Sequence, residues 1–289
     1  MTIWQLAHGR HLDIGEKSIL MGILNVTPDS FSDGGEFDRP ELAIEQAKRM
    51  IGEGAAIVDV GGESTRPNAT PVSPEREQAR ILPVIEALAG EGFLISVDTY
   101  RAETARLAVA AGAHIVNDVH GLQREPDIAK VAADTGAGLV IMHTGRDREK
   151  LPDPIEDQFV FLKRSLAIAA AAGIANDRIV LDPGFGFAKD YEENLQVMAR
   201  FGELKTLGFP LLVGTSRKRM IRHVAGGDRL AQDTGTVATS VILRMKGALI
   251  FRVHNVAMNR DALAFADAMV ERASLSGKEE ASQVGITRP

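Results

Sequence analysis

The sequence contains no cysteine. This absence excludes structural disulfides, thiolate nucleophiles and any zinc or iron–sulfur site held by cysteine. It also fits a reducing compartment, and the segment from Met1 to Arg10 has no apolar stretch typical of a signal peptide. We therefore expect a cytoplasmic protein.

Basic charge, aromatic residues and long apolar runs are scarce as well. The 33 lysines and arginines are outnumbered by 39 aspartates and glutamates, which gives a net charge of −6. Coating a duplex needs a basic surface, and 1 tryptophan and 2 tyrosines leave few platforms for stacked bases. No apolar run approaches the roughly 20 residues that cross a bilayer. We expect small-molecule ligands, with no nucleic-acid and no membrane partner.

The 289 residues do contain a regular alternation of short, β-branched apolar runs and longer segments of helical periodicity. The expected strands are 19–26, 57–61, 94–98, 114–119, 138–143, 179–182, 210–213 and 249–254. The expected helices are 41–53, 74–89, 102–111, 126–135, 155–172, 192–206, 230–246 and 260–273. About eight strand–helix pairs predict an α/β protein with a (β/α)₈ barrel, the TIM barrel.

We expect one domain, because no linker-like Pro/Gly/Ser stretch divides the chain. It consists of an N-terminal segment (1–18), the barrel (19–273) and a polar C-terminal tail without regular structure (274–289). Residues 2–6 and 11–14 suit a β-hairpin that plugs the bottom of the barrel. The alternative is a doubly wound open sheet, although no G-x-G-x-x-G opens a helix after the first strand.

Polar residues follow the ends of the expected strands, where barrels of this kind carry their chemistry. They include Asn25, Glu63, Asp98, Asn117, His143, Asp182, Lys218, Arg252 and His254. A single aspartate in such a place more often caps a turn or helix, and we interpret Asp118 and Asp134 in that way. The collective pattern is harder to explain by caps alone, so we expect a site at this end of the barrel.

Two kinds of chemistry emerge from these residues. Arg252 and His254 lie two apart in a strand and face the same side, and with Arg66 they suit a bound anion. The set formed by Asp98, Asn117, Asp182 and Lys218 suits a flat heterocycle with adjacent N–H groups. Buried cations here need either a bound anion or internal carboxylates (Asp59, Glu63, Asp98, Asp182), and the sequence leaves both open.

The sequence does not decide the role of two loops or the presence of one metal ion. The loops at 27–35 and 61–69 are rich in Gly, Pro, Ser and Asp, so they are either lids or plain connections. No H-E-x-x-H or other His-rich spacing indicates a metal cage built by the protein. A Mg²⁺ ion held by one asparagine and substrate phosphates would leave no such signature.

At these residues the sequence resembles the dihydropteroate synthase family. The matching stretches are MGILNVTPDSFSDGG (21–35), DVGGESTRPNA (59–69), SVDT (96–99), IVNDV (115–119), LDPGFGF (181–187), LLVGTSRK (211–218) and FRVHNV (251–256). The resemblance implies a (β/α)₈ barrel and a transferase of folate biosynthesis. Its reaction joins 6-hydroxymethyl-7,8-dihydropterin pyrophosphate to p-aminobenzoate, giving 7,8-dihydropteroate and pyrophosphate.

The resemblance also implies roles for individual residues. The pterin would be held by Asp98, Asn117, Met142, Asp182, Phe187, Gly214 and Lys218. The pyrophosphate would be held by Asn25, Arg66, Arg252 and His254, with Mg²⁺ on Asn25. The p-aminobenzoate pocket would be formed by Phe31, Thr65, Pro67, Ser216 and Arg219. Catalysis would depend on Asp33, which faces the incoming amine, and on Arg66, Lys218, Arg252 and His254. Sulfonamide inhibitors and a homodimer are further implications.

Some stretches depart from the family pattern, and two other functions stay open. MHTGR (142–146) stands where MHMQG or MHMRG is usual, Asn255 replaces an Asp, Ala188 a Gly, and Arg219 a Ser. One alternative is a related barrel that transfers a methyl group from a reduced folate, although it has no use for a pyrophosphate site. The other is a paralogue that binds pterin without catalysis.

Overall fold

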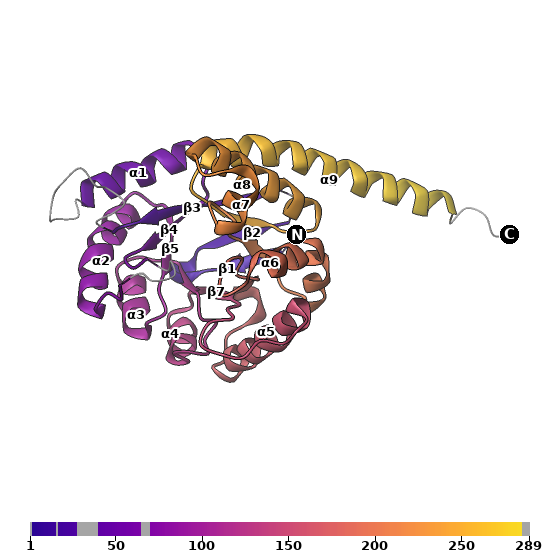
Figure 1. Cartoon of the computed structure of the whole chain (residues 1–289). Coiled ribbons are helices and arrows are strands. Elements are labelled where there is room, and N and C mark those ends of the chain that lie inside the picture. The colour runs from indigo at the N-terminus through magenta and orange to yellow at the C-terminus, as the bar shows by residue number, and fades with distance from the viewer. Residues whose placement is uncertain (1, 16, 28–39, 65–69, 285–289) are drawn as a thin grey trace.

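The computed structural model describes residues 2–15, 17–27, 40–64 and 70–284, and within them eight parallel strands form a barrel (Figure 1). Their spatial order is β8-β7-β6-β5-β4-β3-β10-β9, and a parallel bridge between Leu181 and Leu211 joins the two ends. The strands are β3 (Ile19–Asn25), β4 (Ile57–Gly61), β5 (Leu94–Asp98), β6 (Ile115–Asp118), β7 (Gly138–Met142), β8 (Ile179–Asp182), β9 (Leu212–Val213) and β10 (Ile250–Val253). The predicted barrel is confirmed.

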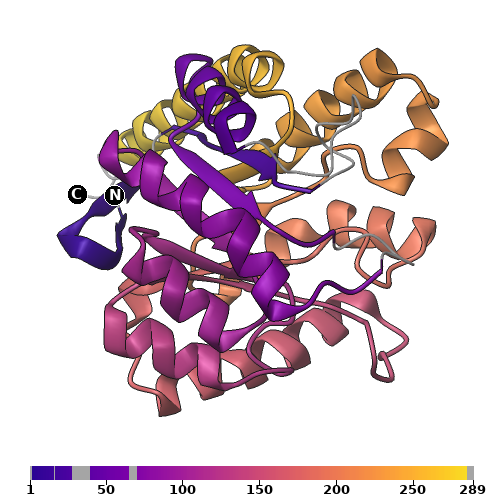
Figure 2. The same cartoon turned by 90° about the vertical axis from the view of Figure 1, so that its left-hand side faces the viewer.

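Helices surround this sheet on the outside (Figures 1 and 2). They are α1 (Pro40–Gly52), α2 (Pro74–Gly90), α3 (Ala102–Ala110), α4 (Asp127–Thr135), α5 (Pro154–Ala171), α6 (Tyr191–Ala199), α7 (Arg219–Ala225), α8 (Arg229–Met245) and α9 (Val256–Val284). Side chains cap several of their first turns. The Ser73, Asp153 and Asp228 side chains accept backbone N–H groups of α2, α5 and α8, and Asp190 forms a capping box with Glu193 at α6.

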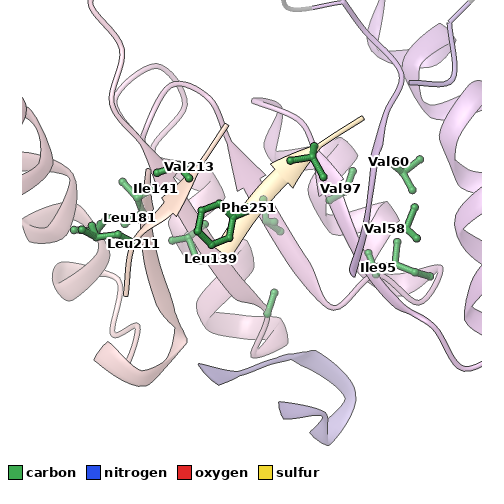
Figure 3. Close-up of a cluster of buried hydrophobic side chains, with 14 of the residues drawn as sticks. Val58, Val60, Ile95, Val97, Leu139, Ile141, Leu181, Leu211, Val213 and Phe251 are labelled. Carbon is green, nitrogen blue, oxygen red and sulfur yellow. The ribbon is translucent and has the colours of Figure 1, made fainter. Parts of the chain in front are cut away.

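The alternation of side chains along each strand separates two apolar layers. Val58, Val60, Ile95 and Val97 point outward and pack under the helices, as do the other side chains labelled in Figure 3. The intervening residues, among them Ile57, point into the barrel. Because both faces are buried, the strands are almost continuously apolar until their carboxyl ends.

An N-terminal hairpin closes one end of the barrel interior, as predicted. Strands β1 (Thr2–Gln5) and β2 (His11–Ile14) pair antiparallel, and the hairpin lies at one end of the molecule in Figure 2. Trp4, Leu6 and Ile14 are buried in the same cluster as the inward-facing strand residues. Gly138 makes room for them, since a Cβ there would lie 2.5 Å from Leu6 Cδ2.

Three details differ from the expectation. The segment expected as one helix over 192–206 is α6 followed by a 3₁₀ helix, Phe201–Leu207, and the short α7 was not predicted. The last helix does not end at 273 but continues to Val284, and Figure 1 shows it running out beyond the barrel. Polar composition does not oppose a helix, because Lys278, Glu279, Glu280 and Ala281 all favour one. No helix among the described residues is both long and apolar enough to span a membrane.

Candidate active site

The sheet register brings the predicted polar residues to one end of the barrel. Asn25 lies opposite Gly61, Gly61 opposite Asp98, and Asp98 opposite Asn117 on four neighbouring strands. Met142 lies opposite Asp182 on the next pair. Residues that are far apart in the chain therefore meet at the carboxyl edge of the sheet.

A cavity opens at this edge, and we call it the slot. It is lined by Asn117, Val119, Met142, Asp182, Gly184, Phe187, Gly214, Lys218 and Arg252. Six of the seven residues predicted for the pterin are among them, and the seventh, Asp98, bonds Arg252. The sequence reasoning missed Val119 and Gly184, which offer no chemical signal of their own.

Arg252 is held in the slot by two internal carboxylates. Its Nε donates to Asp59 Oδ2 at 2.6 Å, and its Nη2 donates to Asp98 Oδ2 at 2.7 Å. Asn117 Nδ2 donates to the same Asp59 oxygen at 3.2 Å. The remaining oxygens, Asp59 Oδ1 and Asp98 Oδ1, are buried and accept no hydrogen bond from the described residues. The site therefore pairs its cation internally and still offers carboxylate acceptors.

Asp59 was predicted as one of the internal carboxylates that could pair with a buried cation, but it was not assigned to the site. It is completely buried on β4, where its side chain points into the barrel between the predicted strand-end residues. Its position in DVGG beside a strand was visible, but its contacts span 193 residues to Arg252 and 58 to Asn117. Only the closed barrel reveals them.

Burial changes the protonation of the slot. It raises the pKa of Asp182 to about 6 and that of Asp98 to about 7, since loss of solvent outweighs the nearby cations. Burial and the neighbouring Arg252 lower the pKa of Lys218 to about 8. The slot is thus a buried, polar pocket where Asp98, Asp182 and Lys218 titrate close to neutrality, a common property of binding and catalytic sites.

The turn after β8 shapes the floor of the slot. Asp182 Oδ1 accepts the Gly184 N–H at 2.7 Å. Gly184 has a φ of 63°, and a Cβ there would lie 2.0 Å from the His143 carbonyl oxygen, so this position requires glycine. The turn leads to Phe187, whose ring lies 4.2 Å from Lys218 Nζ and 4.6 Å from Arg146 Cζ. Two cations therefore contact the one aromatic ring of the lining.

Ser216 and His254 meet beside the slot. The backbone N–H of His254 donates to Ser216 Oγ at 3.2 Å, and the same oxygen lies 2.9 Å from His254 Nδ1. Burial and the charges of Arg217 and Arg252 lower the pKa of His254 to about 3, so the free protein holds it neutral. A second, polar pocket contains His254 together with Arg49, Glu53, Arg217, Arg229 and Asn255. Arg217 and Arg229 were not predicted.

Arg217 separates two predicted site residues in a strained conformation. Its φ is 57°, and Asp233 on α8 accepts from its Nε at 2.6 Å and its Nη2 at 3.0 Å. Asn255 also donates to Asp233, at 3.0 Å. This arrangement holds the loop that carries Ser216 and Lys218 against the end of β10.

Other predictions have mixed outcomes. Asp118 accepts the His120 and Leu122 N–H groups, as expected of a turn cap, whereas Asp134 pairs with Lys130 inside α4 and does not cap it. Neither residue lines the slot. Arg219 begins α7, immediately after Lys218. Phe31, Asp33, Thr65, Arg66 and Pro67 lie outside the described residues, and their roles stay predictions.

Comparisons with known proteins agree with this site. The family described as "Pterin binding enzyme" matches residues 21–254. The dihydropteroate synthase of Clostridium beijerinckii is 44% identical over 265 residues, covering 91% of this chain and 98% of that protein. A Xanthomonas albilineans dihydropteroate synthase structure with 4-aminobenzoic acid is 42% identical, with a TM-score of 0.87 over 93% of this chain and 98% of that one.

A further solved structure carries a drug. The Yersinia pestis dihydropteroate synthase with a sulfonamide drug complex is 40% identical, with a TM-score of 0.85 over 92% of this chain and 98% of that one. Sequence and fold therefore agree over nearly the full length of the relatives. The chain belongs to the pterin binding enzyme family and, within it, to the dihydropteroate synthases.

Proposed function

We propose that the slot holds the pterin ring in the reaction of this family. The reaction joins 6-hydroxymethyl-7,8-dihydropterin pyrophosphate to p-aminobenzoate and releases pyrophosphate. One observation supports the assignment above all: six residues predicted for the pterin, from four different strand ends, line a single cavity. The cavity combines carboxylate acceptors, one amide and one lysine, which suits a flat ring with adjacent N–H groups and a carbonyl.

The carboxylates recognise the donor edge of the ring in this proposal. Asp182 and Asp98 accept ring and amino N–H groups, and the buried Asp59 oxygen reinforces the acceptor character of this wall. Lys218 donates to the ring carbonyl or a ring nitrogen. Ionised carboxylates also favour positive charge on the pterin methylene, the charge that develops when pyrophosphate departs.

Arg252 and His254 serve the anionic end of the substrate. Arg252 uses its Nε and Nη2 for Asp59 and Asp98 and keeps further N–H groups for a phosphate oxygen. The Ser216 hydroxyl at Nδ1 orients the imidazole of His254 and leaves Nε2 for the anion. Arg66 completes this anion site in our proposal.

The bond changes follow from this placement. The C–O bond to pyrophosphate breaks, and its electron pair leaves with the anion held by Arg252 and His254. The neutral aromatic amine of p-aminobenzoate then forms the C–N bond with the methylene carbon. An aromatic amine needs no strong base before attack, so Asp33 orients it and accepts its proton afterwards. Phe31, Thr65, Pro67, Ser216 and Arg219 hold the benzoate, and we propose that sulfonamides occupy the same place.

A magnesium ion fits one position beside the slot. Asn25 ends β3 next to Gly61, and its amide oxygen is a ligand type that Mg²⁺ accepts. The described residues hold no group of three or more His, Cys, Asp or Glu side chains suited to a metal, so substrate phosphates would complete the ligand set. When bound, the ion would neutralise charge on the leaving pyrophosphate.

We further propose a cytoplasmic homodimer, in line with the absence of cysteine and the family resemblance.

The test is a turnover assay with two variants. The purified protein is incubated with the pterin pyrophosphate and Mg²⁺, with and without p-aminobenzoate. Pyrophosphate should be released only when p-aminobenzoate is present. Release that ignores p-aminobenzoate, or no release, would favour the methyl-transferring or the non-catalytic alternative. Asp182→Asn should raise the KM for the pterin substrate strongly. Asp118→Asn is the matched control, since Asp118 also ends a buried strand but serves only turn N–H groups.

A further inference from the structure

A lysine is buried behind the slot without lining it. Lys189 lies in the segment between β8 and α6 and is 9% exposed. Its Nζ donates to His143 Nδ1 at 2.8 Å and to the Gly184 carbonyl at 2.9 Å. Burial of an ammonium group costs free energy unless the group forms hydrogen bonds or ion pairs. The reaction described above does not involve this lysine.

The histidine partner is fixed by a second contact. An ammonium has no acceptor, so His143 Nδ1 accepts from Lys189. His143 Nε2 lies 2.9 Å from both Asp157 Oδ2 and Arg148 Nη2, and Arg148 Nη1 donates to Asp157 Oδ1 at 2.9 Å. Burial and the charge of Lys189 lower the pKa of His143 to about 3, which keeps the ring neutral. The ammonium is thus connected through His143 to Asp157 of α5.

The carbonyl partner belongs to the turn that orients the slot. The Gly184 carbonyl accepts both Lys189 Nζ and the Phe187 N–H, the latter at 3.2 Å. The Gly184 N–H donates to Asp182 Oδ1. One residue, Gly184, therefore connects Lys189 to the carboxylate and to the aromatic ring of the lining.

The charged groups around the turn also connect Lys189 to Asp182. The cations that face Asp182 are Lys218 from the loop after β9, Arg252 from β10, and Lys189. Lys189 in turn faces Asp182, Asp157 of α5, Arg148 and Glu193 of α6. Burial lowers the pKa of Lys189 to about 7 and raises that of Asp182 to about 6, while the charge of each group opposes the shift of the other.

We propose that Lys189 is a positioning residue of the slot: its ammonium holds the Asp182–Phe187 turn through Gly184 and supplies positive charge to the Asp182 carboxylate. The inference rests on the proposed assignment of Asp182 to the pterin. Lys189 does not touch the substrate and takes no part in bond making. It determines how well the slot accepts the donor edge of the ring.

The test compares three lysine variants. Lys189→Met removes charge and donors at similar length, and Lys189→Arg keeps the charge. Lys150→Met is the matched control, because Lys150 Nζ also bonds this segment, at the Ala188 carbonyl, from a more exposed position. The readouts are the KM for each substrate and the Kd of 6-hydroxymethyl-7,8-dihydropterin, a ligand without pyrophosphate, between pH 5 and 8.

Lys189→Met should raise the pterin KM severalfold and leave the p-aminobenzoate KM within about twofold, because only the turn that carries Asp182 and Phe187 loses its support. Its loss of pterin affinity on acidification should begin at a higher pH than in the wild type, since a nearby cation lowers the pKa of a carboxyl group. Lys189→Arg should keep the pterin KM and the pH dependence of pterin binding close to those of the wild type. Lys150→Met should change neither of these two properties.

An unchanged pterin KM in Lys189→Met would overturn the proposal. So would a raised KM without a change in the pH at which pterin affinity is lost on acidification. If Lys189→Met does not fold, Lys189→Gln makes the same comparison, because it keeps a donor for Gly184 without the charge. Asp182→Asn distinguishes failure of the slot assignment from failure of the Lys189 proposal. If Asp182→Asn binds pterin with normal affinity, the slot assignment itself fails. If Asp182→Asn binds pterin weakly and Lys189→Met binds it normally, only the role of Lys189 is refuted.

Discussion

At the scale of single residues, the protonation of Asp182 and Asp98 should control pterin binding. Their pKa values are raised to about 6 and about 7 by burial, so both lose acceptor capacity as the pH falls through this range. The Kd of 6-hydroxymethyl-7,8-dihydropterin should therefore rise on acidification, by up to about tenfold per pH unit per carboxyl. A titration by isothermal calorimetry measures it, and a Kd that stays constant from pH 8 to 5 would contradict the assignment.

The Arg217–Asp233 pair is a second feature at this scale. Asp233→Ala leaves a largely buried guanidinium without its partner and releases a backbone held at a φ of 57°. We expect the free energy of unfolding to fall by about 2–4 kcal/mol, and activity to fall as Ser216 and Lys218 lose their support. Urea denaturation provides the value. Asp134→Ala, which removes an exposed pair with Lys130, should cost less than about 1 kcal/mol.

Ala188 is a residue at which the sequence and the backbone disagree. Its φ is 52°, a left-handed conformation in which a Cβ costs roughly 1–2 kcal/mol. Ala188→Gly removes this strain but gains entropy in the unfolded chain, so the net gain should be about 0.5 kcal/mol. Ala167→Gly, in the exposed face of α5, should instead lose about 1 kcal/mol. Thermal melts of both variants decide, and a clear loss in Ala188→Gly would disprove the strain.

At the scale of elements, the N-terminal hairpin should stabilise the barrel without taking part in chemistry. Trp4 is 1% exposed, packs against the inward strand residues, and donates from Nε1 to the Arg178 carbonyl at 2.9 Å. Trp4→Ala should lower the free energy of unfolding by about 3–5 kcal/mol. The KM values of the folded variant should stay unchanged, because the slot lies at the opposite end of the strands. Ile3→Ala, at a side chain 46% exposed, is the control and should change stability by less than about 0.5 kcal/mol.

Most elements could be predicted because their signals are local. Apolar β-branched runs, glycines after helices and prolines in first turns locate the strands and helices of the barrel within a few residues. Two helical features were missed for a physical reason. The Arg219–Ala225 helix is short and begins inside a site motif, and the last helix continues through a polar segment whose propensity, not its hydrophobicity, decides its structure.

At the scale of the whole molecule, an acidic chain gathers cations at one end of its barrel. Lys218 and Arg252 line the slot, and Arg217 and Arg229 line the pocket beside it. The net charge of −6 therefore gives little guidance to the ligand. Motifs at strand ends predicted most members of the slot and named Asp59 and Asp98 among the possible carboxylate partners, but not which cation each of them pairs with. The pairing of Arg252 with Asp59 and the support of Gly184 by Lys189 arise only when the barrel closes.

A crystal structure with a bound pterin analogue tests most directly whether the slot holds the pterin. We expect the ring between Met142 and Phe187, with its donor edge on Asp182 and Asp98 and its carbonyl side on Lys218. Density for the ring elsewhere, or in the slot without a contact to Asp182, would contradict this placement.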